Sequence, residues 1–313
     1  MWDYNSLDYD YPPYRPPNEA ESALIRVTRG CPWNRCLFCT MYKTLKFQLK
    51  TLDEVKNDID KAAKIYGNAK TIFIADSDSL VMKNIDDVIR HIKLRFPNAE
   101  RITSYARAKT LMKLGSEKLK KIKKAGLTRV HVGLESGDNE TLEFLKKGSS
   151  PKEMIEGGKV AKDSGLDLSF YILIGAGGKK RLKEHAIESA IVCNKVNPDF
   201  IRLRTLVVQH GSILEEKMKE GKYTPTSPVE KLKEVKIFLE NLDVKKCELA
   251  SDHFTNYIWV GSNLVYRGIY GMLPEDKEEM LNTINQTLRF LDITDGEILD
   301  ATILYDKGMI NSL

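Results

Sequence analysis

The sequence of 313 residues has few cysteines and no long run of apolar residues. Its five cysteines are an odd number and do not form a disulfide framework, so they predict thiols that stay reduced. No window approaches the roughly 18 consecutive apolar residues that a membrane-spanning helix needs. The amino terminus also lacks the basic start and apolar run of a secretory signal. We therefore expect a cytoplasmic protein without a membrane span.

The sequence also lacks a strong excess of one charge. It has 49 Lys and Arg residues against 44 Asp and Glu residues, a formal net charge of +5. This excess is too small to require a nucleic-acid partner. The lysine-rich stretch 107–129 carries an apolar stripe beneath its charges, as a solvated helix does, with an RNA or acidic-partner surface as the alternative. We do not expect nucleic acid as a partner.

Short apolar runs alternate with amphipathic helical patterns through most of the chain. Parallel neighbouring strands need a crossover, which a helix provides, so the alternation predicts an α/β fold with a parallel sheet. Six such strand–helix units are compatible with a partial six-stranded barrel or with an open doubly wound sheet. The candidate strands are 23–28, 71–75, 101–106, 129–134, 167–175 and 200–206. The candidate helices are 52–66, 84–96, 111–124, 138–164 with a break at Pro151, 182–196 and 227–241.

The regular alternation defines the expected domain organisation. Residues 1–19 are rich in Tyr, Pro and Asp and predict an extended arm that lies on the fold. Residues 20–245 form the expected barrel core, and 246–313 a short C-terminal extension. Within this extension the patterns indicate a strand near 247, a helix after Pro274 and a terminal strand over 298–306.

Three of the five cysteines, Cys31, Cys36 and Cys39, fall in a short loop after the first candidate strand. Basic neighbours at positions 29, 35 and 43 favour the thiolate form. A structural zinc site and an electron-transfer [4Fe–4S] cluster both take four protein ligands, and the loop has no fourth thiol. Three thiolates would leave one iron of a cubane without a protein ligand, as catalytic zinc keeps an open position.

The run C-x4-C-x2-C, with Phe38 just before the last cysteine, resembles the cluster loop of the radical S-adenosylmethionine (SAM) superfamily, whose commonest spacing is C-x3-C-x2-C. The similarity extends over about residues 12 to 292. It is greatest to an uncharacterised group whose members begin YRPPxEA…GCPxNxCxFCxMYK, with a core like that of coproporphyrinogen dehydrogenases and methylthiotransferases. The resemblance implies a partial (β/α)6 TIM-type barrel with a short C-terminal extension.

The resemblance also implies the cofactors and the reaction. A [4Fe–4S] cluster would be bound by Cys31, Cys36 and Cys39, with S-adenosyl-L-methionine on the fourth iron. Reductive cleavage of SAM would give a 5′-deoxyadenosyl radical that abstracts hydrogen from a substrate. Whether the net reaction is that of an oxidoreductase, a transferase or a lyase stays open. The alternative from another class is an iron–sulfur electron carrier or a zinc-stabilised RNA-binding module.

Further cofactor contacts are implied at the ends of the other strands. After the second strand, Asp76 or Asp78 would hold the SAM amino group, with an acidic helix cap as the alternative. Arg107 would pair with the SAM carboxylate or lie at the rim. Glu135 and Ser136 would lie near the ribose or methionine end, or form a turn. The cofactor-binding residues expected from the resemblance are Phe38, Asp76, Asp78, Arg107, Glu135, Ser136 and Gly175.

Polar residues further along the chain are candidates for the substrate site. Arg202 and Arg204 are two residues apart and share one face of their strand, which indicates a carboxylate or phosphate site in the barrel, with a surface pair as the alternative. His210, His253 and Asn256 are weaker candidates. We expect a small molecule, a peptide or a lipid as substrate, and an electron donor such as ferredoxin or flavodoxin as partner.

Overall fold

The computed structural model of the chain describes residues 7, 9–11 and 13–310. The rest of the predicted arm and the last three residues lie outside the described residues. The chain divides into two compact units. The first comprises the described residues up to Asn34 together with Met41–Val132 and Glu156–Leu168. The second comprises Arg35–Thr40, Gly133–Ile155 and the residues from Ser169 onward.

The main sheet has eight strands in the order β1-β4-β5-β6-β7-β8-β9-β12. All six candidate strands are present, and the mostly parallel sheet with its crossover helices confirms the α/β class and the partial TIM-type barrel. The strands are β1 (Ala23–Arg26), β4 (Thr71–Ala75), β5 (Arg101–Tyr105), β6 (Arg129–Glu135), β7 (Asp167–Ile174), β8 (Phe200–Thr205), β9 (Cys247–Ala250) and β12 (Tyr270–Leu273).

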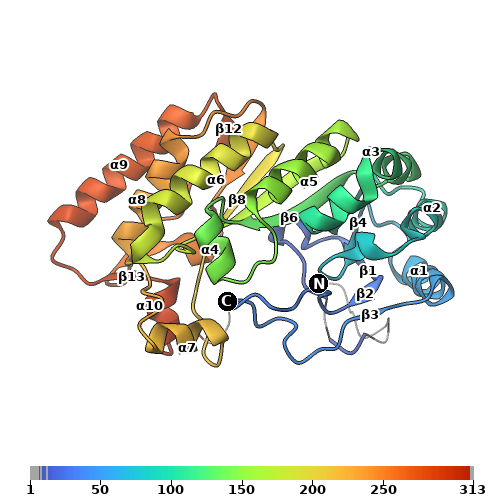
Figure 1. Cartoon of the computed structure of the whole chain (residues 1–313), viewed down its shortest axis with the longest axis horizontal. Helices are drawn as coiled ribbons and strands as arrows, with labels where there is room; N and C mark the ends of the chain where they lie inside the picture. Colours follow the sequence, from blue (N-terminus) through green and yellow to red (C-terminus); the bar gives the residue numbers. More distant parts are fainter. Residues whose placement is uncertain (1–6, 8, 12, 311–313) are drawn as a thin grey trace. The chain divides into compact units, whose positions relative to one another are not determined.

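In the first unit, β1, β4, β5 and β6 pair in parallel. Their crossover helices lie side by side, α1 beside α2 and α2 beside α3 (Figure 1). Helix α1 begins where the sequence predicts, because Thr51 and Glu54 form a reciprocal capping box. The helices of this unit are α1 (Leu52–Tyr66), α2 (Ile85–Arg95) and α3 (Ala108–Ala125).

In the second unit, β7, β8 and β9 run parallel, and β12 is antiparallel to β9. Helix α8 lies between α6 and α9 (Figure 1). The predicted break at Pro151 is confirmed, since one helix ends before it and the next begins on it. The helices are α4 (Asn139–Phe144), α5 (Pro151–Asp163), whose second half belongs to the first unit, α6 (Leu182–Val196), α7 (Ile213–Lys219), α8 (Pro228–Glu240) and α9 (Lys277–Ile293).

Two stretches differ from the sequence prediction. The predicted strand 23–28 is split, and its end forms β2 (Thr28–Arg29), which pairs with β3 (Gln48–Leu49). The predicted terminal strand 298–306 is wrong beyond its first three residues, which form β13 (Ile298–Asp300). The Asp300 carboxylate accepts the Ile303 N–H at 3.0 Å and so begins α10 (Ala301–Asp306).

A small antiparallel sheet completes the extension, with β10 (Ile258–Val260) between β11 (Asn263–Tyr266) and β13. It is tied to the core of the second unit by the buried Lys231 ammonium on α8, which lies 2.7 Å from the Asp300 carboxylate and 2.7 Å from the Thr302 hydroxyl. Across the described part of the chain, the helices are too short or too polar to traverse a bilayer.

Candidate functional site

The cysteine loop runs from β2 to β3, and Cys31 follows β2 directly after Gly30. The Cys31 sulfur accepts the Asn34 N–H at 3.4 Å. The Asn34 side chain donates to the Tyr42 carbonyl at 2.6 Å, and the Lys43 ammonium donates to the Asn34 carbonyl at 2.9 Å. These contacts fold the start of the loop back on itself and point a backbone N–H at the first thiol.

Cys36 and Cys39 belong to the second unit, where Leu37, one of the two residues between them, anchors the backbone. The buried Leu37 donates its N–H to the Leu145 carbonyl at 2.9 Å, and its carbonyl accepts the Leu214 N–H at 3.1 Å. Its side chain belongs to an apolar cluster against which Phe38 packs. The loop is therefore fixed on both sides of Leu37.

Three thiols in one loop have the chemistry of ligands for an iron–sulfur cluster. All three loop cysteines are half-buried thiols outside any disulfide. Among the residues that the structure describes, no three His, Cys, Asp or Glu side chains are grouped to hold one ion. Each thiolate of a cubane binds a different iron atom, so its ligands need not converge on one point. The zinc alternative, which needs four converging ligands, gains no support.

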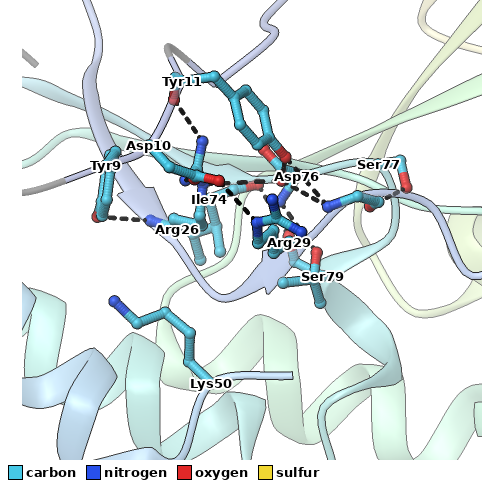
Figure 2. Close-up of polar contacts among 12 residues, drawn as sticks. Tyr9, Asp10, Tyr11, Arg26, Arg29, Lys50, Ile74, Asp76, Ser77 and Ser79 are labelled. Carbon is cyan, nitrogen blue, oxygen red and sulfur yellow. Dashed lines mark hydrogen bonds and ion pairs between the residues drawn. The ribbon is translucent and has the colours of Figure 1, made fainter. Parts of the chain in front are cut away.

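Asp76 follows β4 in the first unit and is completely buried, with a side-chain exposure of 0%. Figure 2 shows its carboxylate against the Tyr11 hydroxyl, which donates to Oδ2 at 2.6 Å. The same oxygen accepts the Gly30 N–H at 3.0 Å and lies 3.7 Å from the Arg26 Nε. The other oxygen, Oδ1, has no hydrogen-bond partner among the residues that the structure describes. Burial raises the pKa of this carboxyl above its usual value.

Asp78 has different surroundings, because both its oxygens serve the first turn of α3. Oδ1 accepts the Arg107 N–H at 3.3 Å, and Oδ2 accepts the Thr110 hydroxyl at 2.6 Å. The structure thus gives Asp78 the contacts of a helix cap supplied from another loop. The Arg107 guanidinium lies over the Trp33 ring, 5.2 Å from its centre.

Glu135 ends β6 in the left-handed region, with φ of 62°. Few residues other than glycine adopt this conformation, so neighbouring contacts must hold it there. Its carboxylate forms an ion pair with Lys147 at 2.7 Å. Ser136 follows and is buried, and its hydroxyl oxygen accepts the Asp138 N–H at 3.0 Å.

A chain of buried polar groups connects Ser136 to Gly175. His185 Nδ1 lies 2.7 Å from the Ser136 hydroxyl, and His185 Nε2 lies 3.2 Å from Glu234 Oε1. The same glutamate oxygen accepts the Gly175 N–H at 2.8 Å, and the Tyr223 hydroxyl donates to the Gly175 carbonyl at 2.7 Å. Sequence reasoning missed His185 and Glu234, since each lies on a helix without any motif around it.

The residues predicted to bind the substrate differ in their contacts with the rest of the protein. Arg202 forms an ion pair with Glu248 at 2.5 Å, and the Arg204 guanidinium lies 5.7 Å from the centre of the Tyr171 ring. Burial, with the charge of Arg204, lowers the pKa of His253 to about 4, so His253 is neutral at pH 7.

Asn256 has a structural role, whereas His210 is largely exposed. The Asn256 side chain accepts a hydrogen bond from the Thr205 hydroxyl and donates hydrogen bonds to the Leu203 and Ser251 carbonyls, each at 2.9 Å. These bonds hold the ends of β8 and β9 together. The His210 side chain is 60% exposed, lies 3.4 Å from the Glu215 carboxylate and stacks on the ring of Tyr305.

The remaining cysteines are fully buried in the second unit. Burial, and then the charge of Cys247, raises the pKa of the Cys193 thiol well above its usual value. A thiol with a raised pKa stays protonated, so Cys193 acts as an apolar core residue and is a poor metal ligand.

Comparison with known proteins places this geometry in a family. The sequence profile of the Radical SAM superfamily matches residues 25–187, just over half of the chain. The tRNA uridine(34) acetyltransferase of Methanocaldococcus jannaschii is 31% identical over 112 residues, which are 36% of this chain and 21% of that protein. An uncharacterized methyltransferase of Pyrococcus horikoshii is 27% identical over 224 residues, which are 67% of this chain and 47% of that protein.

The chain thus spans about a fifth to a half of the length of these curated relatives. Among solved structures, archaeal Elp3 of Methanocaldococcus infernus with an N-terminal deletion superposes with a TM-score of 0.51 at 16% identity, covering 93% of this chain and 69% of that one. This likeness supports the partial barrel. The chain belongs to the radical SAM superfamily, whose enzymes use a [4Fe–4S] cluster and S-adenosyl-L-methionine.

Proposed function

We propose that the protein is an enzyme that binds a [4Fe–4S] cluster through Cys31, Cys36 and Cys39 and cleaves SAM to initiate hydrogen abstraction from a substrate. The observation that carries the proposal is Asp76 Oδ1, a fully buried carboxylate oxygen to which none of the described residues donates a hydrogen bond. Leaving such a group unpaired is unfavourable, and a cationic donor such as the SAM ammonium would satisfy it. Gly30, just before Cys31, is bonded to the other oxygen of the same carboxylate.

The surroundings of the two candidate aspartates favour Asp76 for the amino group of SAM. Asp78 has both oxygens engaged at the start of α3, whereas Asp76 keeps one oxygen available. In the second unit, Glu135, Ser136 and Gly175 are the proposed contacts for the rest of SAM. The buried chain through His185 and Glu234 would hold the ends of β6 and β7 in place for it.

The bound cluster would supply the electron for cleavage of SAM, and the protein would position the substrate and exclude water from a reactive radical. Arg204 beside Tyr171, with a neutral His253 near it, is the proposed substrate anchor, and it suits an anionic group. Ferredoxin or flavodoxin remains the proposed electron donor.

The expectation of no nucleic-acid partner loses its support. Relatives such as the tRNA uridine(34) acetyltransferase act on tRNA. The lysines of α3 offer a basic surface on the first unit, although Lys118 is paired with Asp86. We therefore propose that tRNA be tested as a substrate alongside small molecules, peptides and lipids.

The test of the proposed activity is anaerobic reconstitution with iron and sulfide, followed by dithionite and SAM. We expect 5′-deoxyadenosine, and we expect Cys36→Ala to abolish it together with the bound iron. Cys193→Ala is the matched control, because that thiol is buried outside the loop and should leave both unchanged. Reversible reduction with intact SAM would instead identify an electron carrier, and full product from Cys36→Ala would refute the ligand assignment.

The choice between the aspartates is tested by SAM binding to the cluster-loaded protein. Asp76→Asn should weaken binding by at least about tenfold, because a charged hydrogen bond is lost. Asp78→Asn keeps the shape of a helix cap and should leave the affinity nearly unchanged. The reverse order of effects would assign the amino group to Asp78.

A further inference from the structure

Residues 9–11 of the N-terminal arm enclose the Arg26 guanidinium on β1. The guanidinium lies over two tyrosine rings, 4.6 Å from the centre of Tyr9 and 4.1 Å from the centre of Tyr11. It donates to the Asp10 carboxylate at 2.7 Å and to the Tyr11 carbonyl at 2.5 Å (Figure 2). The Arg26 N–H also donates to the Tyr9 hydroxyl at 2.9 Å. Cation–π contacts and charge-assisted hydrogen bonds of this kind fix a segment firmly.

A second arginine holds the same segment. Arg29 Nε donates to the second oxygen of Asp10 at 2.8 Å, so one carboxylate bridges two arginines (Figure 2). Arg29 is the second residue of β2 and directly precedes Gly30. The arm is therefore fastened both to the strand β1 and to the beginning of the cysteine loop.

The consequence is the placement of the Tyr11 hydroxyl. It donates to Asp76 Oδ2 at 2.6 Å and accepts the Gly30 N–H at 3.1 Å, while the same N–H also reaches Asp76 Oδ2 at 3.0 Å. The Tyr11 hydroxyl, the Asp76 carboxylate and the Gly30 N–H thus each contact the other two, and they join three segments of the chain. Because Oδ2 is occupied twice, the carboxylate cannot rotate freely, and Oδ1 keeps a fixed direction.

Two further hydrogen bonds join the residues after β4 to β2 and to Gly30. The Asp76 N–H donates to the Thr28 hydroxyl at 3.1 Å, and the Ser77 hydroxyl donates to the Gly30 carbonyl at 3.0 Å. Gly30 itself has φ of 82°, a conformation that glycine adopts without strain. The residue before Cys31 is therefore held through its N–H by Tyr11 and Asp76 and through its carbonyl by Ser77.

We propose that Tyr11 is a positioning residue of the cofactor site: its hydroxyl orients the Asp76 carboxylate toward the SAM ammonium and fixes Gly30 at the start of the cysteine loop. This proposal rests on the proposed function, in which Asp76 receives the amino group of SAM. The arm is thereby a part of the site. The ion pairs of Asp10 with Arg26 and Arg29 hold the neighbouring Tyr11 in position. A tyrosine suits the task because a single hydroxyl both donates to a carboxylate and accepts from an N–H.

The test compares Tyr11→Phe with Tyr14→Phe. Both variants remove one hydroxyl from the arm and keep the aromatic ring, and the Tyr14 side chain is on the exposed part of the arm. SAM affinity is measured by equilibrium dialysis on cluster-loaded protein, with iron and sulfide content determined on the same samples. We expect Tyr11→Phe to retain the cluster and to bind SAM about tenfold more weakly, the cost of one hydrogen bond to a charged group. Tyr14→Phe should behave as the wild type.

A double-mutant cycle separates positioning from general damage. If Tyr11 acts through Asp76, then Tyr11→Phe combined with Asp76→Asn should bind SAM no more weakly than Asp76→Asn alone. Independent, additive losses would overturn the proposal. Equal affinities of Tyr11→Phe and Tyr14→Phe would overturn it as well.

Hydrogen exchange on the cluster-free protein gives a readout that does not depend on activity. The amide of Gly30 should exchange faster in Tyr11→Phe than in the wild type, and unchanged exchange would contradict the contact. Failure of the proposed function looks different. In that case the wild type itself would bind no cluster or no SAM, while the exchange experiment would still report on Tyr11 and Gly30.

Discussion

Asp76 and Asp78 show how two identical residues close together acquire different properties. Both are buried carboxylates after β4, and burial raises the pKa of each. Asp76 contacts a tyrosine, an arginine and a backbone N–H, and in the described part of the chain its other oxygen accepts no hydrogen bond. Asp78 meets the first turn of a helix with both oxygens. The first carboxylate is therefore suited to binding a ligand, and the second to holding the first turn of α3.

Asp78 should make the free energy of unfolding depend on pH. Burial raises its pKa from 3.8 to about 6, so the folded state binds a proton that the unfolded state has already released. The resulting stabilisation is complete below about pH 4 and is lost as the pH rises through about 6. Relative to Asp78→Asn, the wild type should lose about 3 kcal/mol of unfolding free energy between these limits.

Urea unfolding of the cluster-free proteins at several pH values measures this difference. Asparagine is the matched substitution because it keeps the shape and cannot ionise. The two unfolding free energies should converge toward low pH and diverge toward neutral pH in favour of the variant. A difference that stays constant with pH would show that Asp78 titrates normally in the folded protein.

At the scale of the elements, the buried ion pair between Lys231 and Asp300 joins α8 to the end of β13. Asp300 also caps α10, so one carboxylate serves both contacts. Removing the lysine would leave a buried charge without compensation, which is far more costly than losing an exposed pair. The attachment of β13 and α10 to α8 should therefore depend strongly on this pair.

We expect Lys231→Met to lower the free energy of unfolding by about 3 to 5 kcal/mol. Lys231→Met combined with Asp300→Asn should be less destabilised, because the lone charge is gone and asparagine still caps α10. Lys236→Met, on the same helix in a partly exposed pair with Glu240, is the control and should change stability by less than about 1 kcal/mol. Denaturant unfolding measures all three, and similar losses for both single variants would contradict the prediction.

The elements also show what the sequence can predict. Periodicity and capping are local, so the six core strands, α1 and the break at Pro151 follow from the sequence. The chain through His185 and Glu234 does not, because its members meet only in the folded protein, 49 and 59 positions from Ser136 and Gly175. The sequence prediction missed the helix α10 for a related reason. Its apolar residues are compatible with a strand, and it is the cap by Asp300 that starts a helix there.

At the scale of the whole molecule, ligand binding adds to the stability of the folded chain. A ligand that binds only the folded state shifts the unfolding equilibrium toward that state, and SAM is the ligand expected here.

We therefore expect SAM, at about one hundred times its dissociation constant, to stabilise the cluster-loaded protein by about 2.7 kcal/mol. Anaerobic thermal unfolding with and without SAM measures the effect. Cys36→Ala, which should carry no cluster, is expected to show no such shift. An equal shift in both proteins would mean that SAM binds without the open iron.

The anchoring of Leu37 has a consequence for how the protein matures. Its two backbone hydrogen bonds and its place in an apolar cluster are made by the polypeptide alone. These contacts join groups of the polypeptide itself, so part of the order of the segment between Cys36 and Cys39 should come from the folding of the chain rather than from the cluster. If Cys36 and Cys39 bind the cluster as proposed, the entropy of ordering this segment is spent during folding, and cluster binding should cost correspondingly less.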